Sequence, residues 1–129
     1  MSTNEIARFV NVPADGSPPL SAGAVSFGGL VFTTQIPDRA DGSVELGDMR
    51  QQCEQLFANL TAQPEVAGSS IGRLLHLTIY LTDMEDRAVF NEVYVERVGQ
   101  PVPVRCAVEV SALAIDGMKV EVTAIAAVL

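Results

Sequence analysis

Segments with strand-like patterns outnumber helical segments in this chain, and that imbalance limits the folds open to it. Apolar residues recur at helical spacing in two stretches only, 48–64 and 82–98. Alternating apolar and β-branched residues predict five strands and a possible sixth, at 25–27, 30–33, 74–81, 104–110, 118–128 and 6–10. The order predicts an α+β fold in which a sheet of about six strands carries two helices on one face.

The second face of such a sheet is left uncovered, because two helices are enough to cover only one side. Strand alternation places several apolar or weakly polar side chains there, namely Leu74, Thr78, Tyr80, Ile125 and Ala127. This set is too apolar to face water comfortably. We therefore expect a homo-oligomer that closes over this face.

Short-range signals agree with these assignments. Gly28 and Gly29 between two strands predict a tight hairpin, because glycine adopts the positive φ that such turns need. Asp48 starts a sequence typical of a capping box, and Pro64 is expected to end or kink the first helix. The side chains expected to face the core from the two helices are Met49, Cys53, Leu56, Phe57, Leu60, Phe90, Val93, Tyr94 and Val98.

The composition indicates one globular domain, residues 1–129, and argues against several partners. With 48% hydrophobic residues, a chain of 129 residues can bury most of its unfolded surface. Eight basic residues against sixteen acidic ones give a net charge of -8, which argues against a nucleic-acid partner. Residues 1–8 lack the pattern of a secretion signal, and no apolar run approaches the ~20 residues of a membrane span. We expect a cytoplasmic protein with no membrane partner.

The residue inventory also argues against several kinds of chemistry. His76 is the only histidine, and no paired metal-ligand spacing accompanies it, so no metal site is expected. Glycine-rich nucleotide-binding patterns are absent as well, so no organic cofactor is expected. Because His76 lies in an apolar strand, we expect a core or interface histidine. Cys53 and Cys106 are expected to be reduced, inert thiols within the core.

Two charged residues interrupt the apolar strands in the last third of the chain. Arg105 lies within 104–110 and Glu121 within 118–128, where an unpartnered charge is costly to bury. One interpretation is a structural ion pair of Arg105 with Glu109 or Glu121. The other makes Arg105 a clamp for a substrate carboxylate, because its planar fork forms two parallel hydrogen bonds and stays charged. Glu121, which can titrate, would then handle water.

Six motifs give the sequence a resemblance to a known family. They are VFTTQIP at 31–37, VAGSSI at 66–71, LTIYLTDM at 77–84, FNEVY at 90–94, PVRCAVEV at 103–110 and VEVTAIA at 120–126. On these motifs the chain resembles the RidA/YjgF family of enamine and imine deaminases over nearly its whole length, and the last two are the most specific. The resemblance implies a chorismate-mutase-like mixed sheet and a homotrimer whose ligand clefts lie between subunits.

The resemblance also implies an activity, the hydrolysis of 2-imino acids or their enamine tautomers to 2-oxo acids and ammonia. Arg105 matches the family's arginine for the substrate carboxylate, and Glu121 matches the glutamate that positions water. Asn91 matches an asparagine near the cleft, and Thr33 stands where a serine hydroxyl is common. Such imines hydrolyse slowly in water alone, so orientation and modest proton handling suffice without a metal or organic cofactor.

Three positions depart from the pattern of that family. Ala107 stands where a cysteine is common two residues after the arginine, and a tyrosine usual in the early loop is replaced around Leu20. Thr34 replaces the glycine usual before Gln35, which should narrow the substrate pocket. These departures leave the identity of the imine or enamine substrate open.

Two non-enzymatic alternatives stand beside the deaminase. A regulatory trimer could use Arg105 to bind a 2-oxo acid or another short carboxylic acid without turnover. A holdase or other protein-interaction role, also attributed to relatives of the family, would depend on exposed apolar surface and not on this arginine. Variants of Arg105 therefore separate the three classes.

Overall fold

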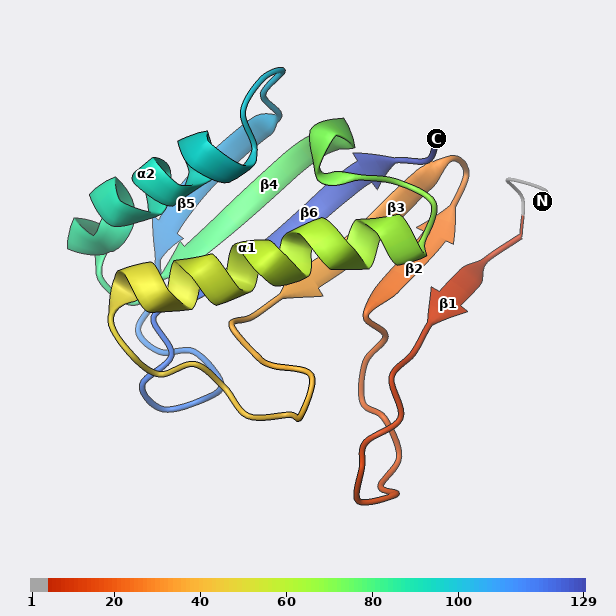
Figure 1. Ribbon diagram of the computed structural model, residues 1–129, viewed down its shortest axis with the longest axis horizontal. Coiled ribbons are helices and arrows are strands. Elements are labelled where there is room, and N and C mark those ends of the chain that lie inside the picture. Colours follow the sequence, from red (N-terminus) through yellow and green to blue (C-terminus); the bar gives the residue numbers. More distant parts are fainter. Residues whose placement is uncertain (1–4) are drawn as a thin grey trace.

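A six-stranded sheet with both helices on one face forms the body of the protein (Figure 1). The computed structural model describes residues 5–129. Its elements are β1 (Ala7–Phe9), β2 (Ala24–Phe27), β3 (Leu30–Gln35), α1 (Met49–Val66), the 3-10 helix η1 (Ile71–Arg73), β4 (Leu74–Leu81), the 3-10 helix η2 (Met84–Asp86), α2 (Arg87–Arg97), β5 (Val104–Glu109) and β6 (Val120–Ala127). The strand order is β1-β2-β3-β6-β4-β5. Only the β4–β5 pair is parallel, so the sheet is mixed and the expected α+β fold is confirmed.

The hydrophobic core lies between the sheet and the two helices. α1 lies over β3 and β6, and α2 packs beside α1 (Figure 1). All nine helix side chains expected to face the core are buried, and Phe57 and Phe90 are fully enclosed. Each large apolar side chain buried in this way contributes about 1.5–3 kcal/mol to folding. Neither helix in the described part of the chain has the length and hydropathy that crossing a bilayer requires.

The turn and helix-end predictions are also confirmed. Gly28 and Gly29 join β2 to β3 with φ values of +64° and +81°, in the left-handed region that favours glycine. The Asp48 carboxylate accepts a hydrogen bond from the Gln51 amide, and the Gln51 side chain accepts one from the Asp48 amide, which completes the capping box. Pro64 lies in the last turn of α1, which ends two residues later.

The other face of the sheet is uncovered by any described residue, as the sequence predicts. Side chains of neighbouring strands line up in rows on this face. Thr34 of β3, Thr123 of β6 and Thr78 of β4 form one row, and Phe32 and Ile125 belong to the next row. Apolar side chains are exposed there, and Phe32 keeps 41% of its surface accessible. We refer to this surface as the bare face.

One residue assigned to the bare face lies elsewhere. Leu74 is buried on the helix side at 7% exposure, whereas its neighbour Leu75 is 46% exposed. The cause is an irregularity in the β4–β6 pairing, which passes from Leu74 directly to His76. A bulge of this kind inserts one extra residue into the strand, so the residues before it point to the opposite face from the one that simple alternation predicts.

Candidate functional site

Arg105 lies on the edge strand β5, opposite Leu77 of β4, and its side chain extends beneath α2. One terminal nitrogen, Nη2, donates a hydrogen bond to Oδ1 of Asn91. The guanidinium carbon Cζ lies 4.5 Å from the centroid of the Tyr94 ring and 6.0 Å from that of Phe90. These distances are within the range of a cation–π contact, so α2 supports the guanidinium from one side.

The structure contradicts the ion-pair interpretation of Arg105. The ion pairs among residues 5–129 involve Arg39, Arg50 and Arg97, and none includes Arg105. The carboxylate of Glu109 instead accepts a hydrogen bond from the Met84 backbone amide, at 2.7 Å. Arg105 is therefore a half-buried cation whose described partners are neutral groups, which leaves its charge available to an anion.

Glu121 lies on β6 opposite Tyr80 and projects toward the bare face. It lines a cavity of about 720 Å³ together with Thr34, Gln35, Asp38 and Asn59, among other residues. Partial burial raises the pKa of the Glu121 carboxyl above its usual range. A raised pKa makes the carboxylate a stronger base than usual, which suits it to accept a proton from an attacking water.

Within one protomer, Arg105 and Glu121 are too far apart to hold one small ligand. β5 and β6 flank β4 on either side, so the two backbones are separated by two strand spacings, or ~10 Å. Their partners on β4 are Leu77 and Tyr80, which adds three residues, or ~10 Å, along the strand. The side chains also point to opposite faces. A site that uses both residues must combine two protomers.

The adjacent residues Thr33 and Thr34 have different environments. The Thr33 side chain is buried; its hydroxyl donates a hydrogen bond to the Gly23 carbonyl at 2.6 Å and accepts one from Gln35 Nε2 at 2.8 Å. With its donor committed to Gly23, this hydroxyl has only its remaining lone pair to offer a ligand, and the predicted role of Thr33 in holding water or substrate stays a prediction. Thr34 is exposed on the bare face and lines the same cavity as Glu121.

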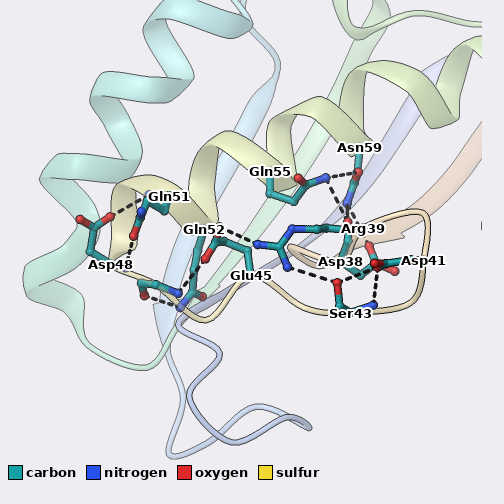
Figure 2. A network of polar contacts seen from close by, with 11 residues as sticks. Asp38, Arg39, Asp41, Ser43, Glu45, Asp48, Gln51, Gln52, Gln55 and Asn59 are labelled. Carbon is teal, nitrogen blue, oxygen red and sulfur yellow. Dashed lines mark hydrogen bonds and ion pairs between the residues drawn. The ribbon is translucent and has the colours of Figure 1, made fainter.

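The loop 36–47 forms one wall of that cavity and is held by the polar face of α1 (Figure 2). Asn59 Nδ2 donates hydrogen bonds to the carbonyls of Ile36 and Asp38, at 2.9 and 2.8 Å, and to the Asp38 carboxylate at 2.9 Å. Gln55 Nε2 donates to the Asp38 carbonyl at 3.1 Å. Burial raises the pKa of Asp38 despite these contacts. Side chains of α1 therefore hold this wall in place. The sequence did not reveal the role of Asn59 and Gln55 in doing so.

A third side-chain amide of α1, that of Gln52, ties the helix to the loop before β6. Gln52 is fully buried, and its Nε2 donates to the carbonyls of Gly47 and Gly117, at 3.1 Å each. Its Oε1 accepts from the Lys119 amide at 2.8 Å. Since Lys119 lies two residues before Glu121, this contact anchors the start of the strand that carries the glutamate.

The bare face contains a hollow of about 460 Å³ that is lined by His76, Thr34, Thr78, Thr123 and Ile125, among other residues. His76 is exposed there, so its predicted core position is wrong and its predicted interface position stays a prediction.

The two cysteines differ in accessibility. Cys53 is buried in α1, as predicted, and burial raises the pKa of its thiol to about 12, which makes it inert. Cys106 is exposed on the bare face, so its predicted core position is wrong. The alternation of β5 was assigned correctly, but the side that faces solvent was not, because Arg105 and Ala107 are the residues that turn toward α2.

Comparison with known proteins identifies the family. The family described as Endoribonuclease L-PSP matches residues 14–128. A RutC family protein of Pyrococcus horikoshii is 42% identical over 105 residues, which are 80% of this chain and 82% of that protein. The Escherichia coli protein named "Putative reactive intermediate deaminase TdcF" is 34% identical over 106 residues, 79% of this chain and 81% of that protein.

Solved structures agree with the sequence comparison. The crystal structure of RidA from the Antarctic bacterium Psychrobacter has a TM-score of 0.82 at 31% identity, covering 95% of this chain and 99% of that one. The fold, the motifs and the length of the match all lead to one assignment. The chain therefore belongs to the L-PSP endoribonuclease family, the group of RutC and RidA proteins that its RidA/YjgF resemblance implied.

Proposed function

We propose that this protein hydrolyses 2-imino acids, or the enamines in equilibrium with them, to 2-oxo acids and ammonia. The observation that carries the proposal is the state of Arg105, a half-buried cation whose described partners are an amide oxygen and aromatic rings. The relative named as a reactive intermediate deaminase supports the same chemistry. A 2-imino acid supplies the carboxylate that this guanidinium lacks.

The chemistry needs only a positioned substrate and a positioned water. Arg105 would hold the carboxylate, and Glu121 would accept a proton from water as its oxygen adds to the imine carbon while the nitrogen is protonated. Glu121 then returns its proton to the nitrogen of the resulting carbinolamine. The hydroxyl group loses its proton and forms the C=O bond of the 2-oxo acid as the C–N bond breaks, and nitrogen leaves with the bonding electron pair as ammonia. Thr34 borders the Glu121 cavity and would limit the size of the substrate side chain.

The proposal includes a homotrimer with sites between subunits, because one protomer cannot bring its own Arg105 and Glu121 together. The bare face supplies the surface that would be buried, since it exposes Phe32, Val104 and Val108. Each site would then take the arginine with Asn91 from one protomer and the glutamate with Thr34 from the next. The predicted cytoplasmic location and the absence of a metal or organic cofactor remain predictions.

The name of the matching family raises RNA cleavage as a competing function. The net charge of -8 opposes it, because RNA binding depends on neutralising phosphates with basic residues. The cavity beside Glu121 is also lined by Asp38. Arg39, the one basic residue among the described residues that line it, is paired with Glu45 at 2.8 Å. A surface of this charge suits a small monoanion held by one arginine better than a polyanion.

The direct test generates 2-imino acids in situ with an amino-acid oxidase. Semicarbazide traps the imine that has not been hydrolysed, and the rate of semicarbazone formation measures how much remains. Wild-type protein should accelerate the loss of imine, and Arg105→Ala should lower kcat/KM by about 10- to 150-fold, the equivalent of a charge-assisted hydrogen bond of ~1.5–3 kcal/mol. Arg87→Ala serves as the matched control, because Arg87 is an exposed arginine at the start of α2.

Three outcomes separate the candidate functions. Imine decay at the buffer rate with wild-type protein, across several side chains, would refute the deaminase. Saturable binding of 2-oxo acids without turnover, lost in Arg105→Ala, would identify a regulatory binding protein. Suppression of aggregation that is equal with and without Arg105 would identify a holdase.

A further inference from the structure

Three aromatic rings form a buried cluster, and the Arg105 guanidinium packs against one edge of it. Phe57 of α1 and Phe90 and Tyr94 of α2 contact one another, with ring centroids 5.3 Å apart for Phe57–Phe90, 6.3 Å for Phe90–Tyr94 and 6.4 Å for Phe57–Tyr94. All three side chains are buried. Arg105 lies at the margin of this cluster and contacts it through Tyr94, at 4.5 Å, more closely than through Phe90, at 6.0 Å.

The hydroxyl group of Tyr94 does not explain why a tyrosine is present. Its oxygen is buried and has no hydrogen-bond partner among the described residues. A buried hydroxyl without a partner lowers stability, so phenylalanine would pack at least as well. What this residue offers to its surroundings is the electron-rich face of its ring, and the group over that face is the Arg105 guanidinium.

The orientation of a guanidinium determines whether it can clamp a carboxylate. Arginine has many rotamers, and a two-bond clamp forms only when the guanidinium plane and its donor edge are correctly directed. The single hydrogen bond from Nη2 to Asn91 fixes one point of that plane. Contact with the Tyr94 ring restricts its remaining rotation, and neither Nε nor Nη1 donates a hydrogen bond to any residue within 5–129.

We propose that Tyr94 is a positioning residue whose ring face holds the Arg105 guanidinium ready for a substrate carboxylate. The proposal rests on the function proposed above and adds a residue to it. Tyr94 touches neither substrate nor water, and it acts by reducing the rotamer freedom that Arg105 would otherwise lose on binding. Its removal should therefore weaken binding of the carboxylate and leave the water-addition step nearly unchanged.

The test compares three changes at position 94 with one control in the same cluster. Tyr94→Phe keeps the ring and should leave KM within about twofold. Tyr94→Leu removes the ring and should raise KM about tenfold with kcat within about twofold. Phe57→Leu is the matched control, because Phe57 packs against Tyr94 and has no described contact with Arg105. It should lower Tm and leave KM unchanged.

A fluorinated ring separates the electrostatic contact from packing. Trifluorophenylalanine introduced at position 94 keeps the shape of phenylalanine but weakens the negative potential of the ring face. KM should rise several-fold relative to Tyr94→Phe at similar Tm, so this comparison stands even when Tyr94→Leu folds poorly. In the Arg105→Ala background the fluorinated ring should have no further effect on KM, as a double-mutant cycle requires.

The outcomes also separate this proposal from the function on which it rests. Equal rises in KM for Tyr94→Leu and Phe57→Leu, or an unchanged KM with the fluorinated ring, would overturn the positioning role while wild-type turnover upholds the deaminase. Should wild-type protein show no turnover, the dissociation constant of 2-oxobutanoate, measured by calorimetry on the same variants, replaces KM as the readout. Unchanged affinity, or no measurable affinity of wild type, would then overturn the role of Tyr94.

Discussion

Arg105 and Glu121 flank the same central strand, yet their side chains leave the sheet on opposite faces. Arg105 rests against α2 on the helix side, whereas Glu121 projects toward the bare face and lines the cavity of about 720 Å³. If both act on one substrate, the arginine of one protomer must meet the glutamate of another. Oligomeric state and activity are therefore expected to change together.

A charge placed on the bare face should dissociate the assembly. Ile125 lies in the middle of this face, beside His76 and Phe32 in the strand pairing. Burying a lysine at an apolar interface is costly, so Ile125→Lys is expected to be a folded monomer with imine hydrolysis near the buffer rate. Light scattering coupled to gel filtration and circular dichroism measure the two properties.

The control for this prediction is Val95→Lys, since Val95 is 69% exposed on α2, away from the bare face. It should keep both the assembly and the activity of wild type. A monomeric Ile125→Lys that retained wild-type turnover would show that one protomer suffices.

Replacing Glu121 with glutamine should act mainly on kcat. Glutamine keeps the size of the side chain but cannot accept the proton of the attacking water, so kcat should fall by about 100-fold or more while KM changes little. Because burial raises the pKa of Glu121, wild-type kcat should decline as the pH is lowered through that raised value, where the carboxyl becomes protonated.

The measurement is kcat against pH, corrected for the buffer reaction, for wild type and Glu121→Gln. The variant should lack the acidic limb. Glu109→Gln is the control, because Glu109 contacts the backbone of Met84 instead of the cavity. An unchanged acidic limb in Glu121→Gln would assign the titration to another group.

Shortening Thr34 should widen the range of accepted substrates. Thr34 lines both the Glu121 cavity and the hollow of the bare face, and Thr34→Gly removes the side chain that narrows them. The ratio of kcat/KM for a bulky aromatic imine to that for 2-iminobutanoate should rise several-fold, at a cost of ~0.5–1 kcal/mol in stability for glycine within a strand. Thr78→Gly is the control, because Thr78 lines the hollow of the bare face but not the Glu121 cavity, and an equal rise in both variants would contradict the assignment of Thr34 to the substrate pocket.

Replacing Asp38 with asparagine should stabilise the protein at neutral pH. Burial raises the pKa of Asp38, so the folded state binds a proton more tightly than the unfolded state. The stability this group contributes is present at low pH and lost as the pH rises through its folded pKa. Asparagine keeps an oxygen to accept the hydrogen bond from Asn59 and removes the buried charge.

Thermal unfolding at several pH values checks this prediction. The gain in Tm for Asp38→Asn should be largest near pH 7 and should shrink toward pH ~4, the ordinary range of an aspartate. Asp41→Asn is the control, and its Tm should fall at pH 7 instead of rising. Hydrogen bonds from Ser43 stabilise the Asp41 carboxylate and lower its pKa, so the charged form favours the folded state. A lower Tm for Asp38→Asn at pH 7 would mean that the carboxylate is needed in its charged form.

The helices were predictable because apolar periodicity and capping depend on residues only three or four positions apart in the sequence. All nine apolar side chains that spacing assigned to the core are buried, and the Asp48–Gln51 capping box formed as expected, although spacing did not reveal the buried amide of Gln52. The bulge at the start of β4 was not predictable, since one extra residue leaves no mark in a run of leucines. That single irregularity moved Leu74 into the core and Leu75 out of it.

The site was only partly predictable for a related reason. Alternation along β5 and β6 indicated which residues share a face of each strand, but not which of the two faces the helices cover. The opposite orientation of Arg105 and Glu121 depends on sheet-wide pairing, which residues far apart in the chain decide together. The buried hydroxyl of Thr33 was hidden for the same reason, because its partner Gly23 lies on another segment.

The amides of α1 that support loop 36–47 bind mainly its main-chain oxygens, those of Ile36, Asp38 and Gly47. Every amino acid has such an oxygen, so the contour of the loop is largely independent of what its side chains are. Substitutions along its tip can therefore alter the chemistry of the cavity wall while the scaffold stays in place. An ancestral protein built this way could diversify its substrates through a few surface changes, without first redesigning its interior.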